Sequence, residues 1–300
     1  MVALINVESS LPRPLWALVR HLAGQPRKRQ RLADAEAILS PPSLVPEGDK
    51  QRTFERATRT AEEFGLVERA EDVLALSAEA QAVDGEDLEA FYDLLRQRVL
   101  TRVSTETLAT DPSQTQGKDL LRSLCWFLTL DSQLTRVTVN TFGVEQHKAL
   151  ADDLGNPLRN KERWNGFTYW APALGFADAP LLQAGGARAL VPDCTRAVRR
   201  TVREQWRSGT HLRAREFVDG LLEVLPVLPG GRFSRALGLK PGPLDVAAVL
   251  SFALQRGREE GWLILSAPSD AIGGVQFSDP RAAGGVGRFT DVEIGADDNG

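Results

Sequence analysis

The first eighty residues carry the pattern that most constrains the fold: three helical periods followed by two short apolar runs. Amphipathic helix spacing occurs at residues 11–24 (LPRPLWALVRHLAG), 32–39 (LADAEAIL) and 50–65 (KQRTFERATRTAEEFG). The proline-rich stretch before the third segment cannot continue a helix, because proline lacks an amide donor. Residues 66–67 and 73–76 are strand candidates on either side of a charged turn. This order is typical of a winged helix-turn-helix.

The third helical segment has an apolar face and a basic face. At 100° per residue, one stripe holds Phe54, Ala57, Ala61 and Phe64, and the opposite face holds Arg52, Arg56 and Arg59. In a winged helix that opposite face is open to the DNA groove or the phosphates. A solvated arginine face is the alternative interpretation.

A basic run between the first two helices adds charge to the same region. It supplies Arg27, Lys28, Arg29 and Arg31. Residues 1–60 hold ten Lys/Arg against six Asp/Glu, whereas the whole chain has a net charge of -4. The local excess of basic residues therefore favours this region over the rest of the chain as a DNA contact.

The pattern around Gly65 is repeated further along the chain. The pattern of residues 61–77 is partly repeated at residues 171–193 and 258–279. Aligning Gly65 with Gly175 places Trp164, Phe167, Ala171 and Leu174 on the apolar stripe. In the third copy, Ala248 and Phe252 stand where Arg52 and Arg56 would, so protein contact is the expected role of that helix.

The repeats predict a mainly α-helical chain with small β-hairpin wings, built of three tandem winged helix-turn-helix units joined by helical connectors. The expected segments are an N-terminal winged helix (1–80), a helical connector and linker (81–117), a middle winged helix (118–193), a basic connector helix (194–210), a C-terminal winged helix (211–280) and an acidic, frayed tail (281–300).

The connector helix at 194–209 has an arginine ribbon. Its members are Arg196, Arg199, Arg200, Arg203 and Arg207, at helical spacing. Such a ribbon can neutralise several phosphates and make binding strongly salt-dependent. Contact with a partner protein and simple solvation remain open, because arginine stems also cover apolar surface.

Residues 162–176 (ERWNGFTYWAPALGF) concentrate aromatic side chains in a chain that is 7% aromatic. On the aligned helix, Trp164, Phe167 and Phe176 belong to the core. Tyr169 and Trp170 lie off the stripe and are candidates for stacking on a base or binding a partner. Packing of a half-buried helix on a neighbouring unit is the alternative for these two.

Signatures of catalysis and of membrane insertion are weak. The three histidines are widely separated, and the motifs of phosphate loops, dinucleotide folds and serine hydrolases are not found. Residues 291–294 (DVEI) resemble a nuclease carboxylate pair without a basic partner. We therefore expect no enzyme, no cofactor and no metal, with a hidden nuclease or nucleotide site as the remaining alternative. The chain start lacks the features of a signal peptide, and no apolar run reaches membrane-spanning length. The expectation is a cytoplasmic protein with reduced cysteines and no membrane partner.

Three segments together resemble a known bacterial family. LPRPLWALVRHLAG, ERWNGFTYWAPALGF and LVPDCTRAVRRTV are similar to the DpdG group. That group is encoded with machinery that places 7-deazaguanine bases in DNA and with associated restriction components. The resemblance implies a context of DNA modification and phage defence, and it supplies no catalytic residues.

These patterns lead to one expected function and two alternatives. The expected function is a non-catalytic DNA-binding or adaptor subunit of a multi-protein system, with double-stranded DNA and other subunits of a defence or modification complex as partners. Its contacts would be to phosphates, which give affinity with little sequence specificity. The alternatives are a winged-helix scaffold without DNA contact and a transcriptional repressor that binds as a symmetric dimer.

Overall fold

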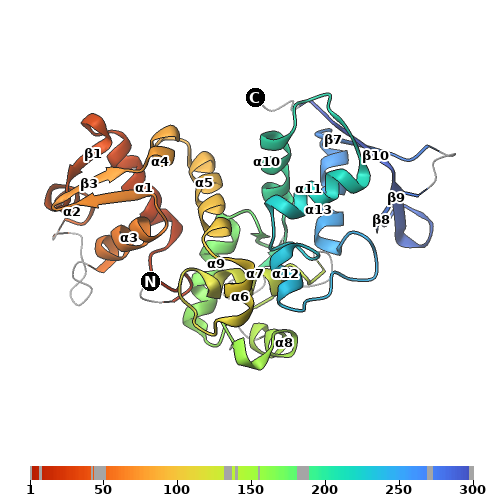
Figure 1. The fold of residues 1–300 in the computed structure, drawn as a ribbon, viewed down its shortest axis with the longest axis horizontal. Coiled ribbons are helices and arrows are strands. Elements are labelled where there is room, and N and C mark those ends of the chain that lie inside the picture. Colours follow the sequence, from red (N-terminus) through yellow and green to blue (C-terminus); the bar gives the residue numbers. More distant parts are fainter. Residues whose placement is uncertain are drawn as a thin grey trace. The chain divides into compact units, whose positions relative to one another are not determined.

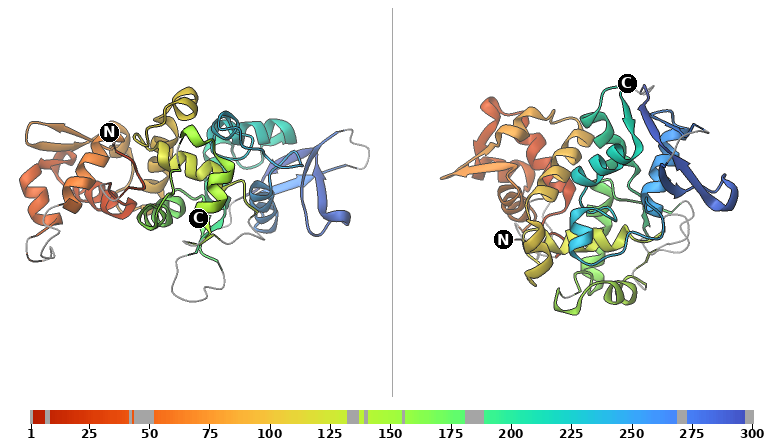
Figure 2. Two further views of the ribbon diagram at one scale, coloured as in Figure 1. Left: turned by 90° about the horizontal axis from the view of Figure 1, so that it is seen from below. Right: turned by 45° about the vertical axis from the view of Figure 1, so that its right-hand side comes forward.

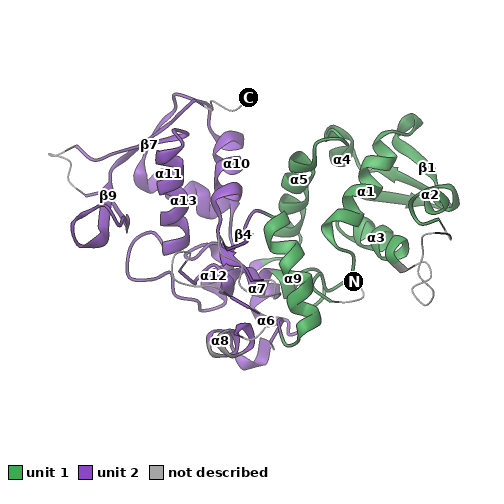
Figure 3. Ribbon diagram, turned by 180° about the vertical axis from the view of Figure 1, so that it is seen from behind, with its two compact units in different colours: residues 1–104, 113–120, 159–174 green, residues 105–112, 121–158, 175–300 purple. Residues whose placement is uncertain are grey.

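The structure of the chain is a computed structural model with helices over about half of its length and several small antiparallel sheets (Figure 1). It describes residues 2–6, 9–41, 43, 52–131, 137–138, 141–154, 156–180, 189–268 and 273–296. The chain forms two compact units (Figure 3). The first unit comprises Met1–Ser104, Ser113–Leu120 and Arg159–Leu174, and the second comprises Thr105–Pro112, Leu121–Leu158 and Gly175–Gly300.

The first unit begins with the N-terminal module, a name we use for residues 12–76. Its elements in chain order are α1 (Pro12–Ala23), η1 (Pro26–Lys28), β1 (Arg29–Arg31), α2 (Leu32–Leu39), α3 (Arg52–Glu63), β2 (Val67–Ala70) and β3 (Val73–Leu76). The three strands form one antiparallel sheet with the order β1-β3-β2. The predicted helices and hairpin are therefore present, and a third strand joins them.

The apolar stripe of α3 packs into the module core. Phe54, Ala57, Ala61 and Phe64 are all buried. Gly65 ends the helix at φ +64°, a left-handed conformation that glycine adopts without a steric penalty. The helical period of the sequence therefore predicts correctly which side of α3 faces inward.

The remainder of the first unit is helical. It contains α4 (Ala78–Ala82), α5 (Leu88–Thr101), the start of α7 (Lys118–Phe127) and α9 (Lys161–Ala173). Asp87 caps α5 by accepting hydrogen bonds from the amides of Glu89 and Ala90. The buried N-terminal residues Leu4 and Ile5 donate their amides to Asp119 at 3.0 and 2.9 Å. These bonds tie the start of the chain to α7.

The second unit contains the C-terminal module, defined here as residues 195–294 and drawn in teal to blue (Figure 2). Its elements are α10 (Thr195–Gln205), β6 (His211–Arg213), α11 (Ala214–Val224), α12 (Arg232–Ala236), α13 (Ala248–Glu259), β7 (Leu263–Ser266), β8 (Val275–Ser278), η4 (Ala283–Gly285), β9 (Val286–Phe289) and β10 (Asp291–Ile294). The main sheet has the order β6-β10-β7, and β8 pairs with β9.

The two modules share their pairing register and, apart from η1 in the first and α12 and β8–η4–β9 in the second, their order of elements. Ala70 pairs with Val73 in the first, as Ser266 pairs with Asp291 in the second. The entry to the second helix is also equivalent: the Leu32 amide donates to the Asp72 carbonyl, and the Ala214 amide donates to the Thr290 carbonyl. The chain therefore builds the same frame twice.

The C-terminal module runs from α10 to β10 and therefore joins parts of three segments that the sequence predicted as separate: 194–210, 211–280 and 281–300. The basic helix, α10, packs on α11 and α13 as the first helix of the module. Its end is fixed by Trp206, whose ring lies 5.2 Å from that of Phe217. A Cβ added at Gly220 of α11 would come within 3.0 Å of the same Trp206 ring.

The expectation of a frayed acidic tail is wrong for residues 286–294. They form β9 and β10, and β10 is the central strand of the main sheet. Val292 and Ile294 are buried. This burial outweighs the acidic residues between them. Asp297 and Asp298, expected in the same tail, lie outside the described residues.

The expected middle unit, 118–193, is divided between the two compact units. Its third helix, α9, belongs to the first unit, while β4 (Ala177–Asp178) and β5 (Val191–Pro192) pair within the second. The second unit also holds α6 (Thr105–Thr110), α8 (Phe142–Ala149) and η3 (Asp152–Leu154), and Val137 forms a bridge with Leu190. Residues 181–188, expected in the wing, lie outside the described residues.

Candidate nucleic-acid interface

The arginines of α3 lie on the face opposite the buried stripe. Arg59 is exposed and Arg56 is half-buried. Arg52 is the first residue of the helix, and its side chain lies outside the described part of the structure. The exposed Thr53 and Glu55 belong to the same outer side. The face is thus arginine-rich and carries one acid in its first turn.

The basic run 27–31 does not form a single patch. Arg27 and Lys28 have left-handed backbone angles, φ 56° and 51°, in η1. Lys28 donates its ammonium to the Gln81 carbonyl beyond the end of β3, whereas Arg31 pairs with Asp72 at the β2–β3 turn, at 3.0 Å. These two contacts lie at opposite ends of the sheet, with the exposed Arg29 between them. Of the residues in this run, Arg31 is the one paired at the β2–β3 turn.

The β2–β3 turn of the N-terminal module is tight and rich in acidic residues. Glu68, Glu71 and Asp72 are exposed, and Glu71 has a left-handed φ of 50°. Sequence analysis did not single out these acids, although their charge is visible in the segment LVERAED. These three acids outnumber Arg69, the exposed basic residue of the same turn, so the turn itself is a poor surface for phosphates.

Four of the five ribbon arginines lie on α10, and Arg207 lies beyond the end of the helix. Arg196 and Arg203 are exposed, while Arg199 and Arg200 are half-buried. Arg199 pairs with Glu260 at 3.3 Å and lies over the Trp262 ring at 6.0 Å. Arg199 therefore has a structural role in holding α10 to the end of α13, and the exposed charge of the ribbon is smaller than the spacing predicts.

Tyr169 and Trp170 have different surroundings. Trp170 is 0% exposed, and its indole Nε1 donates to the Ser10 carbonyl at 3.3 Å. Tyr169 is 39% exposed. Trp170 is therefore no candidate for stacking on a base, and the alternative, packing of the helix, holds for this residue because it is buried in the first unit. The predicted core residues Trp164, Phe167 and Phe176 are buried.

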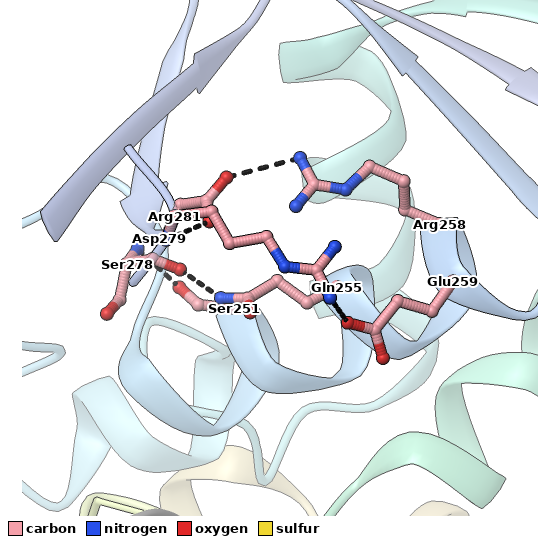
Figure 4. Close-up of polar contacts among 7 residues, drawn as sticks. All are labelled: Ser251, Gln255, Arg258, Glu259, Ser278, Asp279 and Arg281. Atoms are coloured by element: carbon pink, nitrogen blue, oxygen red, sulfur yellow. Dashed lines mark hydrogen bonds and ion pairs between the residues drawn. The ribbon is translucent and has the colours of Figure 1, made fainter. Parts of the chain in front are cut away.

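One side of α13 is held against the β8–β9 hairpin through Ser251, Gln255, Arg258 and Glu259 (Figure 4). Ala248, Phe252 and Gln255 occupy the positions equivalent to Arg52, Arg56 and Arg59. Gln255 donates to the Ser278 carbonyl, and the Ser278 amide donates to Ser251 Oγ at 3.1 Å. This cover is the feature that sequence analysis missed most completely.

The pKa shifts of Asp119, Cys125 and Cys194 are caused mainly by burial. Burial raises the pKa of Asp119 to about 6, against the lowering effect of three backbone amides and of Arg163. Burial also raises the pKa of the Cys125 and Cys194 thiols, which keeps them in the unreactive thiol form. In the part of the chain that the structure describes, His, Cys, Asp and Glu side chains form no group that could hold a metal ion.

The DVEI segment, considered as a nuclease-like carboxylate pair, is strand β10. Asp291 Oδ1 accepts a hydrogen bond from Arg213 at 2.7 Å, and Glu293 lies 3.9 Å from His211. Among the described residues, no helix combines the length and the apolar character that crossing a membrane requires.

Comparison with known proteins gives one match. A family model described as DpdG-like matches residues 2–271, which include α3, α9 and α13. The β8–β9 hairpin and β10 follow the matched residues. No curated protein and no solved structure matches the chain. Because the family model covers most of its length, the chain belongs to the DpdG-like family.

Proposed function

We propose that the chain is a non-catalytic adaptor subunit that contacts duplex DNA in a modification or phage-defence system. Membership of the DpdG-like family supports that context. The observation that carries the proposal is α3: its inner side is buried, and its outer side presents Arg56 and Arg59. Other subunits of the same system are the proposed protein partners.

In this proposal both modules are winged helices, and the middle segment is a divergent third copy. The order helix, strand, helix, helix, strand, strand with central pairing of the last strand supports this interpretation. In such a frame the third helix is the one that enters the major groove. The contacts at α3 would be to phosphates, with α10 as a second basic surface through Arg196 and Arg203.

The test is duplex-DNA binding as a function of salt. We expect the wild type to bind at low salt, and Arg56→Ala/Arg59→Ala to weaken binding and to reduce the slope of log K against log salt by about 2. Arg102→Ala/Lys161→Ala is the matched control, because it removes the same charge from exposed positions of the first unit. If the wild type shows no measurable binding to duplex DNA at low salt, the DNA-contact proposal is contradicted.

A protein scaffold without DNA contact is the second candidate. The covered face of α13 favours it, because a module whose third helix is occupied cannot read a groove through that helix. Co-purification with the products of neighbouring genes, from cells expressing wild type or Arg56→Ala/Arg59→Ala, separates the two. Retention of every partner by the variant, together with absent DNA binding by the wild type, supports the scaffold.

A further inference from the structure

The C-terminal module contains an insertion that the N-terminal module lacks. In the N-terminal module, the paired residues Ala70 and Val73 are joined by two residues, Glu71 and Asp72. In the C-terminal module, the equivalent pair Ser266 and Asp291 is joined by residues 267–290, twenty-four residues in place of two. The insertion therefore starts and ends where the frame itself needs only a tight turn.

The inserted hairpin has a small core of its own. Val275, Phe277 and Phe289 are buried, and the rings of Phe277 and Phe289 meet edge to face at 5.4 Å. Gly287 faces Phe277, and a Cβ there would lie 2.7 Å from that ring. The hairpin is thus a folded element rather than a long loop.

The hairpin is bonded to α13 and to the residues before it (Figure 4). The Val246 amide donates to the Gln276 carbonyl at 3.1 Å, and Ser251 and Gln255 bond to the main chain of Ser278. Two ion pairs flank these bonds: Arg258 with Asp279 at 3.1 Å, and Arg281 with Glu259. Asp279 is only 6% exposed, so the first pair is largely shielded from solvent.

We propose that the β8–β9 hairpin packs on α13 permanently and thereby prevents this helix from contacting nucleic acid. The hairpin bonds to Ser251 and Gln255, whose equivalents on α3 are the exposed Glu55 and Arg59. Of the two third helices, only α3 of the N-terminal module then contacts a duplex. This last step depends on the proposed function, whereas the occlusion of α13 does not.

Thiol labelling tests the occlusion directly. The natural cysteines, Cys125 and Cys194, are both 0% exposed, so a new thiol dominates the reaction with a maleimide. We expect Ser251→Cys to react about a hundredfold more slowly than Glu55→Cys, its exposed equivalent on α3, because reaction needs local opening of the hairpin. Comparable rates in the folded full-length chain would overturn the proposal.

An arginine graft tests the consequence for DNA. Ala248→Arg/Phe252→Arg, made in Arg56→Ala/Arg59→Ala, places arginines at the α13 equivalents of Arg52 and Arg56. With the hairpin present we expect no gain in duplex affinity. With residues 267–290 exchanged for the Glu-Asp turn of the N-terminal module, we expect a gain of about tenfold at low salt.

Two outcomes of the graft would contradict the occlusion: a gain with the hairpin in place, or no gain in a folded exchange variant. The thermal unfolding transition establishes whether that variant folds, and the labelling result stands even where it does not. Failure of the proposed function can be distinguished from failure of this proposal. In the first case the wild type does not bind DNA, while the graft variants and the labelling rates still measure whether α13 is covered.

Discussion

The N-terminal and C-terminal modules share a frame and differ in what covers their third helix. In both, the last strand is central, and an arginine at the end of the first strand pairs with an aspartate: Arg31 with Asp72, and Arg213 with Asp291. Outside this frame, α3 presents arginines, whereas Ser251 and Gln255 of α13 are buried and bond to an inserted hairpin.

The difference teaches that the frame and the surface are set by separate residues. Buried side chains and strand register determine the frame, as at the equivalent residues Leu74 and Val292, which are apolar and buried. The outer residues of the third helix and the length of the β-turn determine what that helix can touch. One frame can therefore serve two roles in one chain, which is why fold alone does not assign a function.

The largest expected effects test whether β10 is a true equivalent of β3. Leu74 and Val292 occupy equivalent central positions, paired with Gln30 and Leu212, and both are buried. We expect Leu74→Ala to lower the free energy of unfolding by about 2–5 kcal/mol and Val292→Ala by roughly 2 kcal/mol, measured by urea denaturation. Val286→Ala, at an exposed position, is the control. No effect of Val292→Ala would mean that residues 291–294 behave as a tail.

The pH dependence of stability distinguishes the first unit from the second. Asp119 is buried in the first unit with its pKa raised to about 6, whereas the carboxyl in an unfolded chain titrates near 3.8. The folded state holds the proton more tightly, so this group stabilises the fold as the pH falls from about 6 to 4, by on the order of 3 kcal/mol.

Amide exchange at pH 7 and pH 5 measures this effect for each unit. We expect protection of the N-terminal module to rise at pH 5 relative to that in Asp119→Asn, and protection of the C-terminal module to change equally in both proteins. Asp84→Asn, at an exposed position, controls for a general change of charge. An equal pH response in wild type and Asp119→Asn would contradict the raised pKa.

The ion pairs at the two β-turns are expected to differ in strength. Asp279 accepts from Arg258 and from the Arg281 amide, and its side chain is 8% exposed, whereas Asp72 is 59% exposed. We expect Asp279→Ala to cost about 1–3 kcal/mol, because it removes two part-buried hydrogen bonds of a shielded carboxylate, and Asp72→Ala to cost less than about 1 kcal/mol. Urea denaturation of the two variants compares them, and equal costs would argue against a tightly held hairpin.

The sequence predicted the helical faces well because their cause is local. The stripes Phe54 to Phe64 and Trp164 to Leu174 follow from the helical period, and both are buried as expected. The alignment of Ala248 and Phe252 with Arg52 and Arg56 agrees with the strand registers. These inferences needed only residue spacing and the position of one glycine.

The failures have non-local causes. The alternation in Val292 and Ile294 signals a strand, but only pairing with residues some eighty positions earlier shows that it is central. Trp170 lies off the stripe and is nevertheless buried, because the Ser10 region covers it. The basic run 27–31 is divided by a strand whose partners lie beyond residue 70. Tertiary contacts of this kind leave no periodic signal.

The smallest expected effect concerns the arginine–aspartate pairs made by the equivalent residues Arg31 and Arg213. If α3 and its surroundings contact DNA, Asp72 competes with phosphate for Arg31 in the N-terminal module, so Asp72→Asn should raise duplex affinity. The energy of an exposed pair implies a change of roughly two- to fivefold at low salt that fades as salt rises. Asp291→Asn frees Arg213 in the same frame of the C-terminal module and should leave affinity unchanged, because the neighbouring third helix is covered. Fluorescence anisotropy with a labelled duplex measures both variants. An equal rise in both would show that general charge, rather than the position of Arg31, governs the binding, and it would remove the functional distinction between the two modules.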